Sequence, residues 1–543
     1  MPAPTADHLP PQVAPPEVAL SDLGPYAVLG VDVVAVPVLP AESPQDGAGD
    51  SNRAGSDEPR TGPVLGPGAA ELSDGLGLDL LAVLDLEEAT GAVGEVIRVP
   101  VPLGGPENAQ LRWVLLVGVG QQRPVDLRRA GAALARAVRN REAVATSVPA
   151  AAGPAGMTAG LEAFVVGLVL GSFGFSWSSR DPEQPPVRRA VLAGVGDTAE
   201  HRQVLARALA IAGAGWQARL LATVPSNLKN PAWLAQQAVE TAGRAGLDVE
   251  IWDEHRLADE GFGGVLGVGQ ASASPPRLIR LDYTPPGASK KTPTVVLVGK
   301  GITFDTGGLS IKPAEGMATM KRDMTGGAVV IATMAALGAV GCPVRVVGLV
   351  PAAENAVSGS AMRPGDVVRH YGGRTSEVTN TDAEGRLVMA DALAYGVARL
   401  QPAAIVDVAT LTGAMKVALG LRTGGYFADD EALAAHLAAA AEDSGETLWR
   451  MPLADVYEER IASEVADADN AGGGPGAITA ALFLRHFTGD VPWAHLDIAS
   501  VGDSPVDVHE YSTGPTGFGA RALLSWLGSA DPLAGVGEGQ QRP

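Results

Sequence analysis

The feature that most restricts the fold is a series of short, valine-rich apolar runs separated by longer stretches with helical spacing. In the first 200 residues the runs are Tyr26 to Leu39, Leu111 to Val119 and Val187 to Val195. Apolar runs of this length, bounded by Gly and Pro, are typical of strands buried on both faces. Helical spacing covers Leu127 to Ala145 and Ala159 to Leu170. The alternation predicts a mainly parallel sheet with helices on both faces.

The same alternation returns in the second half of the chain. A long helical region begins near His201 and continues past Pro231. The predicted strands that follow are Leu278 to Tyr283, Thr294 to Gly299, Val344 to Val350 and Ala404 to Val408, with helices at Gly326 to Leu337 and Leu387 to Leu400. We therefore predict two α/β domains, at 21–199 and 200–527. Residues 1–20 and 528–543 are expected to be disordered, and the Pro/Gly/Ser-rich stretch at about 40–71 to be a flexible insertion.

Length and charge exclude several classes of protein. A chain of 543 residues, 46% hydrophobic, is long enough for two or more domains. Its formal net charge of -21 makes nucleic acid an unfavourable partner. The single cysteine, Cys342, allows neither a disulfide framework nor a thiolate zinc site. Met1 to Leu20 lacks the pattern of a signal peptide, and no run predicts a membrane span, so we expect a cytoplasmic location.

The octapeptide Asn380 to Leu387 carries the densest chemistry. Asp382, Glu384 and Arg386 stand two residues apart. In an extended or turning backbone, residues i and i+2 lie on the same side, so all three side chains are expected to face one cavity. Gly385 would permit a tight bend there. The alternative is a solvated acidic loop that caps the helix after it.

Further charged residues follow the strand predicted at Thr294 to Gly299. Lys300 and Asp305 come directly after it, where α/β sheets place their ligands. Lys312 follows, and Asp323 precedes the next predicted helix. Each has a plainer alternative, because Asp323 could be a helix N-cap and Lys300 a solvated lysine at a strand end.

Together these segments predict a metal site made of oxygen ligands. Clustered carboxylates are tolerated only when protonated, paired or bound to cations, and oxygen-rich clusters suit Mn, Mg or Zn. His370 is the only histidine between Lys300 and Arg386, and there is no His-Glu-x-x-His motif. The chain also lacks the Gly-x-Ser-x-Gly elbow of serine hydrolases and the phosphate-binding loop of nucleotide triphosphatases.

The chain resembles the leucyl aminopeptidase family, the two-metal M17 cytosol aminopeptidases. The resemblance covers about 215 to 525 and rests on Val298–Gly308, Ile311–Pro313, Met320–Met324, Asn380–Leu387, Asp407–Ala414, Gly476–Leu484 and Trp493–Ala499. It implies an N-terminal macro-like α/β domain and a C-terminal α/β peptidase domain with a mixed central sheet. Thr306 and Gly327 depart from the residues common in the family, but neither is a metal ligand there.

The resemblance also implies a role for each site residue. The metal ligands would be Lys300, Asp305, Asp323, Asp382 and Glu384, with Asp305 and Glu384 bridging two Mn²⁺ or Zn²⁺ ions. Lys300 can ligate only when neutral. Lys312 would stabilise the oxyanion, and Arg386 would hold a bicarbonate that shuttles the proton. Substrate contacts would be Met320, Thr410, Leu411 and Gly413, although Met320 and Thr410 could also be plain core residues.

The implied function is hydrolysis of the N-terminal, Leu-like residue of peptides by a metal-bridging hydroxide, in a homohexamer. One alternative is a non-catalytic or moonlighting regulator that binds DNA or a nucleotide on the same fold, and another is a structural oligomer component. A purely binding descendant should have lost ligands, whereas all five are present. A DNA binder should carry a basic stripe, whereas this chain is acidic.

Overall fold

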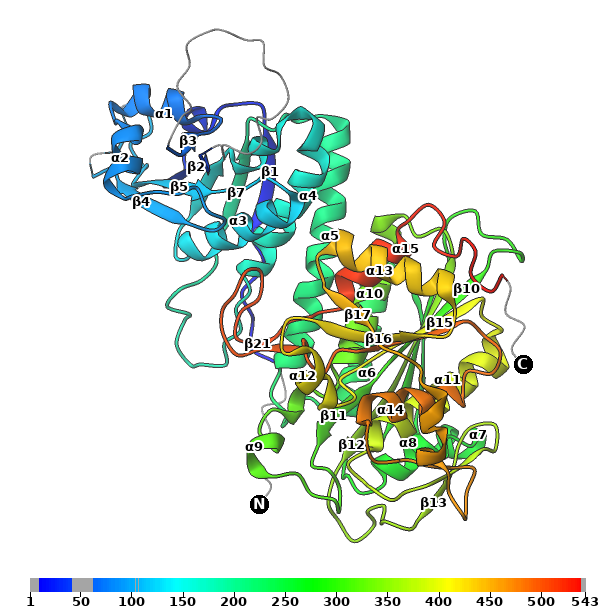
Figure 1. Cartoon of the computed structure of the whole chain (residues 1–543). Coiled ribbons are helices and arrows are strands. Elements are labelled where there is room, and N and C mark those ends of the chain that lie inside the picture. The colour runs from blue at the N-terminus through cyan, green and yellow to red at the C-terminus, as the bar shows by residue number, and fades with distance from the viewer. Residues whose placement is uncertain (1–8, 42–61, 103, 106, 539–543) are drawn as a thin grey trace. The chain divides into compact units, whose positions relative to one another are not determined.

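The chain forms two compact units, seen in a computed structural model that describes residues 9–41, 62–102, 104–105 and 107–538 (Figure 1). One unit consists of Pro10–Ala212 with Val506–Ser512, and the other of Gly213–Pro505 with the described residues from Thr513 onward. The division falls within the long helix α5 (Ala199–Thr223), beyond the boundary predicted near residue 200. Residues 1–8, 42–61 and 539–543 of the predicted disordered segments lie outside the described residues.

The first unit is built on a seven-stranded sheet with the order β1-β7-β6-β2-β5-β4, in which β3 pairs with β2. Only the β4–β5 and β2–β3 pairs are antiparallel. The strands are β1 (Glu17–Ser21), β2 (Val33–Leu39), β3 (Val64–Leu65), β4 (Val96–Pro100), β5 (Trp113–Gly118), β6 (Ala143–Thr146) and β7 (Arg189–Ala193). The helices are α1 (Ala69–Leu76), α2 (Leu80–Leu86), α3 (Pro124–Ala137) and α4 (Gly153–Gly171).

Three segments of this unit differ from the sequence-based expectation. Strand β1 lies partly in the N-terminal stretch expected to be disordered, because it pairs in parallel with β7. β3 and the start of α1 occupy the end of the expected insertion, and β3 adds to the sheet beside β2. The helix expected over Leu127 to Ala145 ends at Ala137, and Asn140 then has a φ of 60°. The apolar residues that made the predicted helix too long belong to β6, a buried strand.

The second unit is built on a nine-stranded mixed sheet with the order β17-β16-β19-β15-β10-β12-β9-β8, and β11 pairs with β12. Its centre is parallel, and antiparallel pairs flank it at β9 and β16. The strands are β8 (Asp248–Trp252), β9 (Arg277–Tyr283), β10 (Thr294–Gly299), β11 (Gly301–Asp305), β12 (Arg345–Asn355), β15 (Ala404–Ala409), β16 (Gly424–Ala428), β17 (Leu448–Arg450) and β19 (Trp493–Asp497). The smaller β13 (Val367–Arg369), β14 (Thr375–Glu377) and β18 (Ala468–Asp469) form a separate sheet.

Helices cover both faces of this sheet. α10 (Thr325–Val340) packs on β10, β12 and β15 and contacts α6 (Pro231–Ala245) and α15 (Ala520–Leu527). α11 (Glu384–Leu400) packs on the same strands and contacts α8 (Gly263–Gly269) and α14 (Gly476–Arg485). Val296 and Val298 of β10 belong to the cluster around α11, and alternate residues of a strand face opposite sides. The predicted two-domain α/β class, with a mixed sheet in the second domain, is confirmed.

Two helical stretches are long and apolar enough to cross a membrane, judged by length and composition. They are Val148–Gly171 and Ala314–Val340, whose most apolar windows are 56% and 83% buried inside the protein. A helix that is apolar all round is also what a buried core position requires. α10 illustrates this, because it lies between the central strands and two further helices.

Candidate metal centre

The candidate site begins where β10 ends. Lys300 follows β10 directly, and its backbone is fixed by hydrogen bonds from its N–H to the oxygen of Val408 (3.0 Å) and from the N–H of Gly327 to its own oxygen (2.8 Å). A Cβ on Gly326 would lie 2.0 Å from the oxygen of Val408, so only glycine lets α10 start this close to the strands. The backbone at the carboxyl ends of β10 and β15 is therefore held tightly together.

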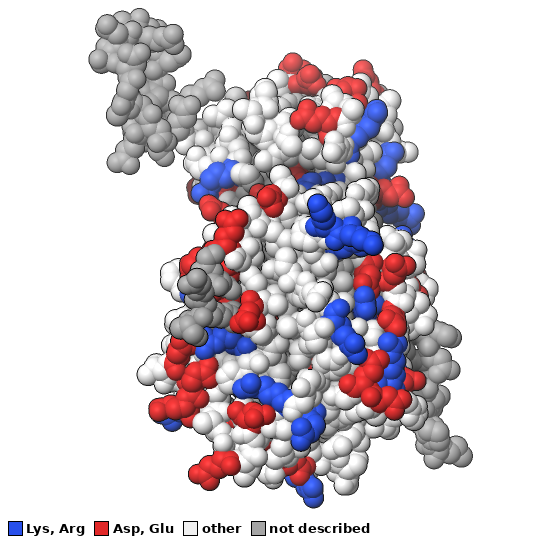
Figure 2. All heavy atoms as spheres, turned by 90° about the vertical axis from the view of Figure 1, so that its right-hand side faces the viewer, with Lys and Arg blue, Asp and Glu red and all other residues white. Residues whose placement is uncertain are grey.

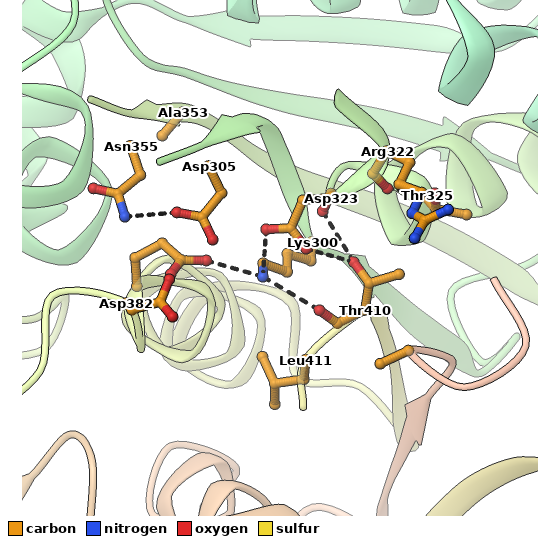
Figure 3. Close-up of polar contacts among 12 residues, drawn as sticks. Lys300, Asp305, Arg322, Asp323, Thr325, Ala353, Asn355, Asp382, Thr410 and Leu411 are labelled. Carbon is orange, nitrogen blue, oxygen red and sulfur yellow. Dashed lines mark hydrogen bonds and ion pairs between the residues drawn. The ribbon is translucent and has the colours of Figure 1, made fainter. Parts of the chain in front are cut away.

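Lys300 is buried among carboxylates (Figure 3). Its Nζ lies 2.7 Å from Asp323 Oδ2 and 2.9 Å from Glu384 Oε1, and it donates to the oxygen of Thr410 at 3.4 Å. Burial acts to lower the pKa of Lys300, but Asp323, Glu384 and Asp305 outweigh it and raise that pKa above its usual value. Lys300 is an ammonium when no cation is present, so it can ligate a metal only by giving up a stabilised proton.

Three carboxylates converge beside it. Asp305, Asp382 and Glu384 each offer one oxygen, and these oxygens lie within 4.8 Å of one another. Lys312 contacts two of them, with its Nζ 2.8 Å from Asp305 Oδ2 and in an ion pair with Asp382. Burial acts to lower the pKa of Lys312, but Asp305 and Glu384 outweigh it and raise that pKa, so the side chain is also an ammonium.

The carboxylates resist ionisation in the absence of a metal. Burial, reinforced by Asp305, raises the pKa of Glu384 to about 8. Burial also raises the pKa of Asp323 to about 6, although Lys300 opposes it. The Oε2 atom of Glu384 is buried and has no hydrogen-bond partner among the described residues. Four carboxylates that share two lysines, with one oxygen unpartnered, fit a site that holds divalent cations.

Asp323 is not a helix N-cap. Helix α10 begins at Thr325 after Met324, and no side chain caps it. The carboxylate of Asp323 instead accepts a hydrogen bond from Thr410 Oγ1 at 2.8 Å and pairs with Lys300. The N-cap alternative is wrong because these two contacts use the Asp323 carboxylate. The alternative of a solvated Lys300 is wrong because this side chain is buried and paired with Asp323 and Glu384.

The octapeptide reaches the site by a different route from the one expected. Helix α11 begins at Glu384, so Glu384 and Arg386 do not share a side through an extended backbone. Gly385 is inside that helix and makes no special bend. Its lack of a side chain is needed because a Cβ there would lie 2.4 Å from Lys300 Cε. Glycine at this position therefore makes room for the lysine.

Arg386 is buried with unused hydrogen-bonding capacity. Its Nε and Nη1 have no hydrogen-bond partner among the described residues. Burial lowers the pKa of Arg386 to about 10, against the opposing effect of Glu384, Asp497 and Asp469. Two such donors on a buried cation fit a small anion.

The four predicted substrate contacts differ in burial and in their contacts with the carboxylates. Thr410 lies beside the carboxylates through its bond to Asp323, and Leu411 is partly buried with its N–H donating to Asp497 Oδ1 at 3.1 Å. Gly413 is exposed. Met320 opens the short 3-10 helix Met320–Arg322 before Asp323 and is partly buried. These four roles stay predictions.

Sequence reasoning missed two polar residues that hold the site together. Asn355, the last residue of β12, donates from Nδ2 to Asp305 Oδ1 at 2.8 Å. Asp497, the last residue of β19, accepts hydrogen bonds from the Leu411 and Thr412 backbone. A polar residue that ends a buried strand is the signal that could have found both.

His370 is buried with Asp391 and Ser376, at hydrogen-bond distances of 3.0 and 2.9 Å.

Comparison with protein families identifies the chain. The sequence model of the cytosol aminopeptidase family catalytic domain matches residues 216–524, and that of the family's N-terminal domain matches residues 60–178. The chain belongs to the cytosol aminopeptidase family. It is therefore an aminopeptidase of the M17 metallopeptidase class, with peptides as its substrates.

Individual members of the cytosol aminopeptidase family agree over most of the chain. A probable cytosol aminopeptidase of Leifsonia xyli is 40% identical over 94% of this chain and 98% of that protein. One of Streptomyces coelicolor is 41% identical over 85% of this chain and 92% of that protein. The resemblance inferred from the motifs is confirmed.

Solved structures give the same result. A tomato leucine aminopeptidase mutant has a TM-score of 0.79 and 32% identity, covering 94% of this chain and 96% of that one. The bottromycin maturation enzyme BotP in complex with Mn has a TM-score of 0.77 and 35% identity, covering 92% and 99%. In this chain, the acidic cluster of Asp305, Asp382 and Glu384 and the metallopeptidase family indicate a site for divalent metals.

Proposed function

We propose that this chain is a two-metal leucyl aminopeptidase that removes an apolar, Leu-like residue from the N-terminus of peptides. The convergence of Asp305, Asp382 and Glu384 oxygens within 4.8 Å carries the proposal. The buried Oε2 of Glu384, which has no hydrogen-bond partner in the part of the chain that the structure describes, supports it, because such an atom needs a cation or a proton.

The five proposed metal ligands are Lys300, Asp305, Asp323, Asp382 and Glu384. Asp305 and Glu384 would contact both ions, and Lys300 and Asp323 would hold the more loosely bound ion. The metals are Mn²⁺ or Zn²⁺. Two such cations supply Lewis acidity and lower the pKa of a shared water.

The remaining residues handle charge and orientation. Lys312 stays an ammonium beside Asp305, so it can stabilise negative charge that develops on the scissile carbonyl oxygen. Arg386 would hold a bicarbonate through Nε and Nη1, which have no hydrogen-bond partner among the described residues, and the bicarbonate would supply a proton carrier in place of a protein base. Among the described residues, no hydrogen bond or ion pair joins a histidine to these carboxylates, because His370 is paired with Asp391 and His495 with Asp407.

Substrate contacts and assembly complete the proposal. Thr410, Leu411 and Gly413 line the path of the peptide backbone, and Met320 contributes to the wall around the first side chain, which favours Leu-like residues. The protein acts in the cytoplasm as a homohexamer. A monomeric mass by light scattering at assay concentration would contradict the hexamer.

The face in Figure 2 gives no support to the alternative of a nucleic-acid-binding regulator. On the face in Figure 2, Lys and Arg side chains are scattered among Asp and Glu side chains and do not form a stripe. A phosphate backbone is bound by clustered basic residues.

The proposed function is tested with a leucine anilide substrate. The purified protein is stripped with a chelator, and Mn²⁺, Zn²⁺ or Mg²⁺ is added back separately. We expect activity to vanish and then to return with Mn²⁺ or Zn²⁺. Full activity after stripping, or none with any metal, would overturn the proposal.

A further inference from the structure

The buried side chain of Asn355 connects two segments that carry proposed metal ligands (Figure 3). Its Nδ2 donates to Asp305 Oδ1 at 2.8 Å and to the backbone oxygen of Thr381 at 3.1 Å. Thr381 directly precedes Asp382. Both amide hydrogens of Asn355 are thus used, one on each segment.

The orientation of Asp305 follows from these contacts. Its Oδ1 accepts hydrogen bonds from Asn355 and from the N–H of Gly307 at 2.8 Å. Its Oδ2 faces Lys312 at 2.8 Å. One oxygen of the carboxylate is therefore fixed by neutral donors, and the other is presented to the charged centre.

The backbone around Asn355 strengthens the connection. Its carbonyl oxygen accepts from Thr306 N at 3.0 Å and from Thr306 Oγ1 at 2.9 Å. On the other side, Thr381 Oγ1 donates to the oxygen of Gly307 at 2.6 Å and accepts from the N–H of Ser310 at 2.8 Å. The two ligand-bearing segments are held together at several points, with Asn355 between them.

Close packing leaves little room for adjustment here. Gly308 has a φ of 64°, and a Cβ on it would lie 2.9 Å from Thr381 Oγ1 and 3.0 Å from Asn355 Oδ1. A longer side chain at position 355 would have to push this turn away. The geometry selects a residue of the size of asparagine.

We propose that Asn355 is a positioning residue that sets the spacing between Asp305 and the Asp382–Glu384 segment and thereby sets the affinity of the site for divalent cations. The proposal rests on the proposed two-metal function. Asparagine suits this role because it donates two hydrogen bonds without adding charge. An aspartate of the same shape would add another carboxylate to the cluster and would donate to neither partner.

The test compares the metal affinity of Asn355→Asp with that of the wild-type chain. Loss of an outer partner of a metal ligand typically weakens metal binding about 10–100-fold. We expect Mn²⁺ affinity, measured by calorimetry on the chelator-stripped full chain, to fall within that range. Excess Mn²⁺ should restore much of kcat, which a general loss of folding would not allow. Wild-type affinity within about twofold would overturn the proposal.

Two further variants separate the possible causes. Asn108→Asp changes another buried asparagine, in the first unit, whose Nδ2 donates to the oxygen of Val31 at 2.9 Å. It should leave Mn²⁺ affinity unchanged, and an equal loss there would overturn the proposal. If Asn355→Asp does not fold, Asn355→Ser takes its place with the same expected loss. A wild-type chain that binds no Mn²⁺ would overturn the proposed function itself.

Discussion

The two units share an α/β architecture but treat buried charge differently. In the first unit, buried Asp126 is paired with Arg123 at 2.8 Å, and buried Arg128 is paired with Glu510 at 2.9 Å. In the second, four carboxylates share two lysines, and Glu384 keeps an unpartnered oxygen among the described residues. Paired charges of this kind serve folding. An excess of buried carboxylates over their lysine partners, here called the surplus, costs stability unless a cation joins them. The surplus distinguishes the catalytic unit of this aminopeptidase.

The largest effect is expected from removing one of the four clustered carboxylates of the second unit. Asp382→Ala or Glu384→Ala should reduce hydrolysis of a leucine anilide to background and lower the number of metal ions bound per chain, because each supplies a proposed ligand. The matched control is Asp126→Ala in the first unit, which should retain activity and metal content. Full metal content and activity in the Asp382 and Glu384 variants would remove them from the site.

A smaller effect is expected from removing the positive charge of Lys312 beside these carboxylates. Lys312→Met should leave the metals bound and reduce kcat about 10²–10³-fold, the usual result of removing an oxyanion donor. Steady-state kinetics at saturating metal, with metal content measured on the same samples, make the distinction. An unchanged kcat would exclude Lys312 from the mechanism.

The pH dependence of metal binding follows from the raised carboxyl pKa values. Burial, with Asp305, raises the pKa of Glu384 to about 8, so this group gains a proton as the pH falls below 8. Burial raises the pKa of Asp323 to about 6, so it follows at lower pH. Cations bind the ionised forms, and Mn²⁺ affinity should fall at least about tenfold per pH unit from 8 to 6. Calorimetric titrations at pH 6, 7 and 8 measure it, and a flat profile would contradict the titration of these carboxylates.

The smallest effect on activity is expected in the first unit. Arg128→Met removes the 2.9 Å ion pair with Glu510 and should lower the free energy of unfolding by about 1–3 kcal/mol. Metal content and kcat of the folded protein should stay at wild-type values. Denaturant unfolding and kinetics on one preparation test this. A loss of metal would show that the ion pairs of the first unit and the carboxylate cluster of the second are coupled.

The α/β class predicted from the sequence is confirmed, whereas the roles of the site residues stay predictions. Lys300, Asp305 and Asp323 were proposed because they lie at strand and helix ends, a local pattern. The extended or turning backbone expected at Asp382 to Arg386 is wrong from Glu384 onward, because α11 begins there, whereas Asp382 lies in a turn. Asn355 and Asp497 were missed because they are far along the chain from the residues they orient. Only the folded sheet brings them there.

The most direct test of the surplus of carboxylates is a crystal structure of the full chain loaded with Mn²⁺, with an anomalous difference map recorded at the manganese edge. We predict two peaks, both among Lys300, Asp305, Asp323, Asp382 and Glu384, with Lys300 turned from its carboxylate partners to a metal ion. A map with no peak there, or with Lys300 still paired to Asp323 and Glu384, would contradict the two-metal site.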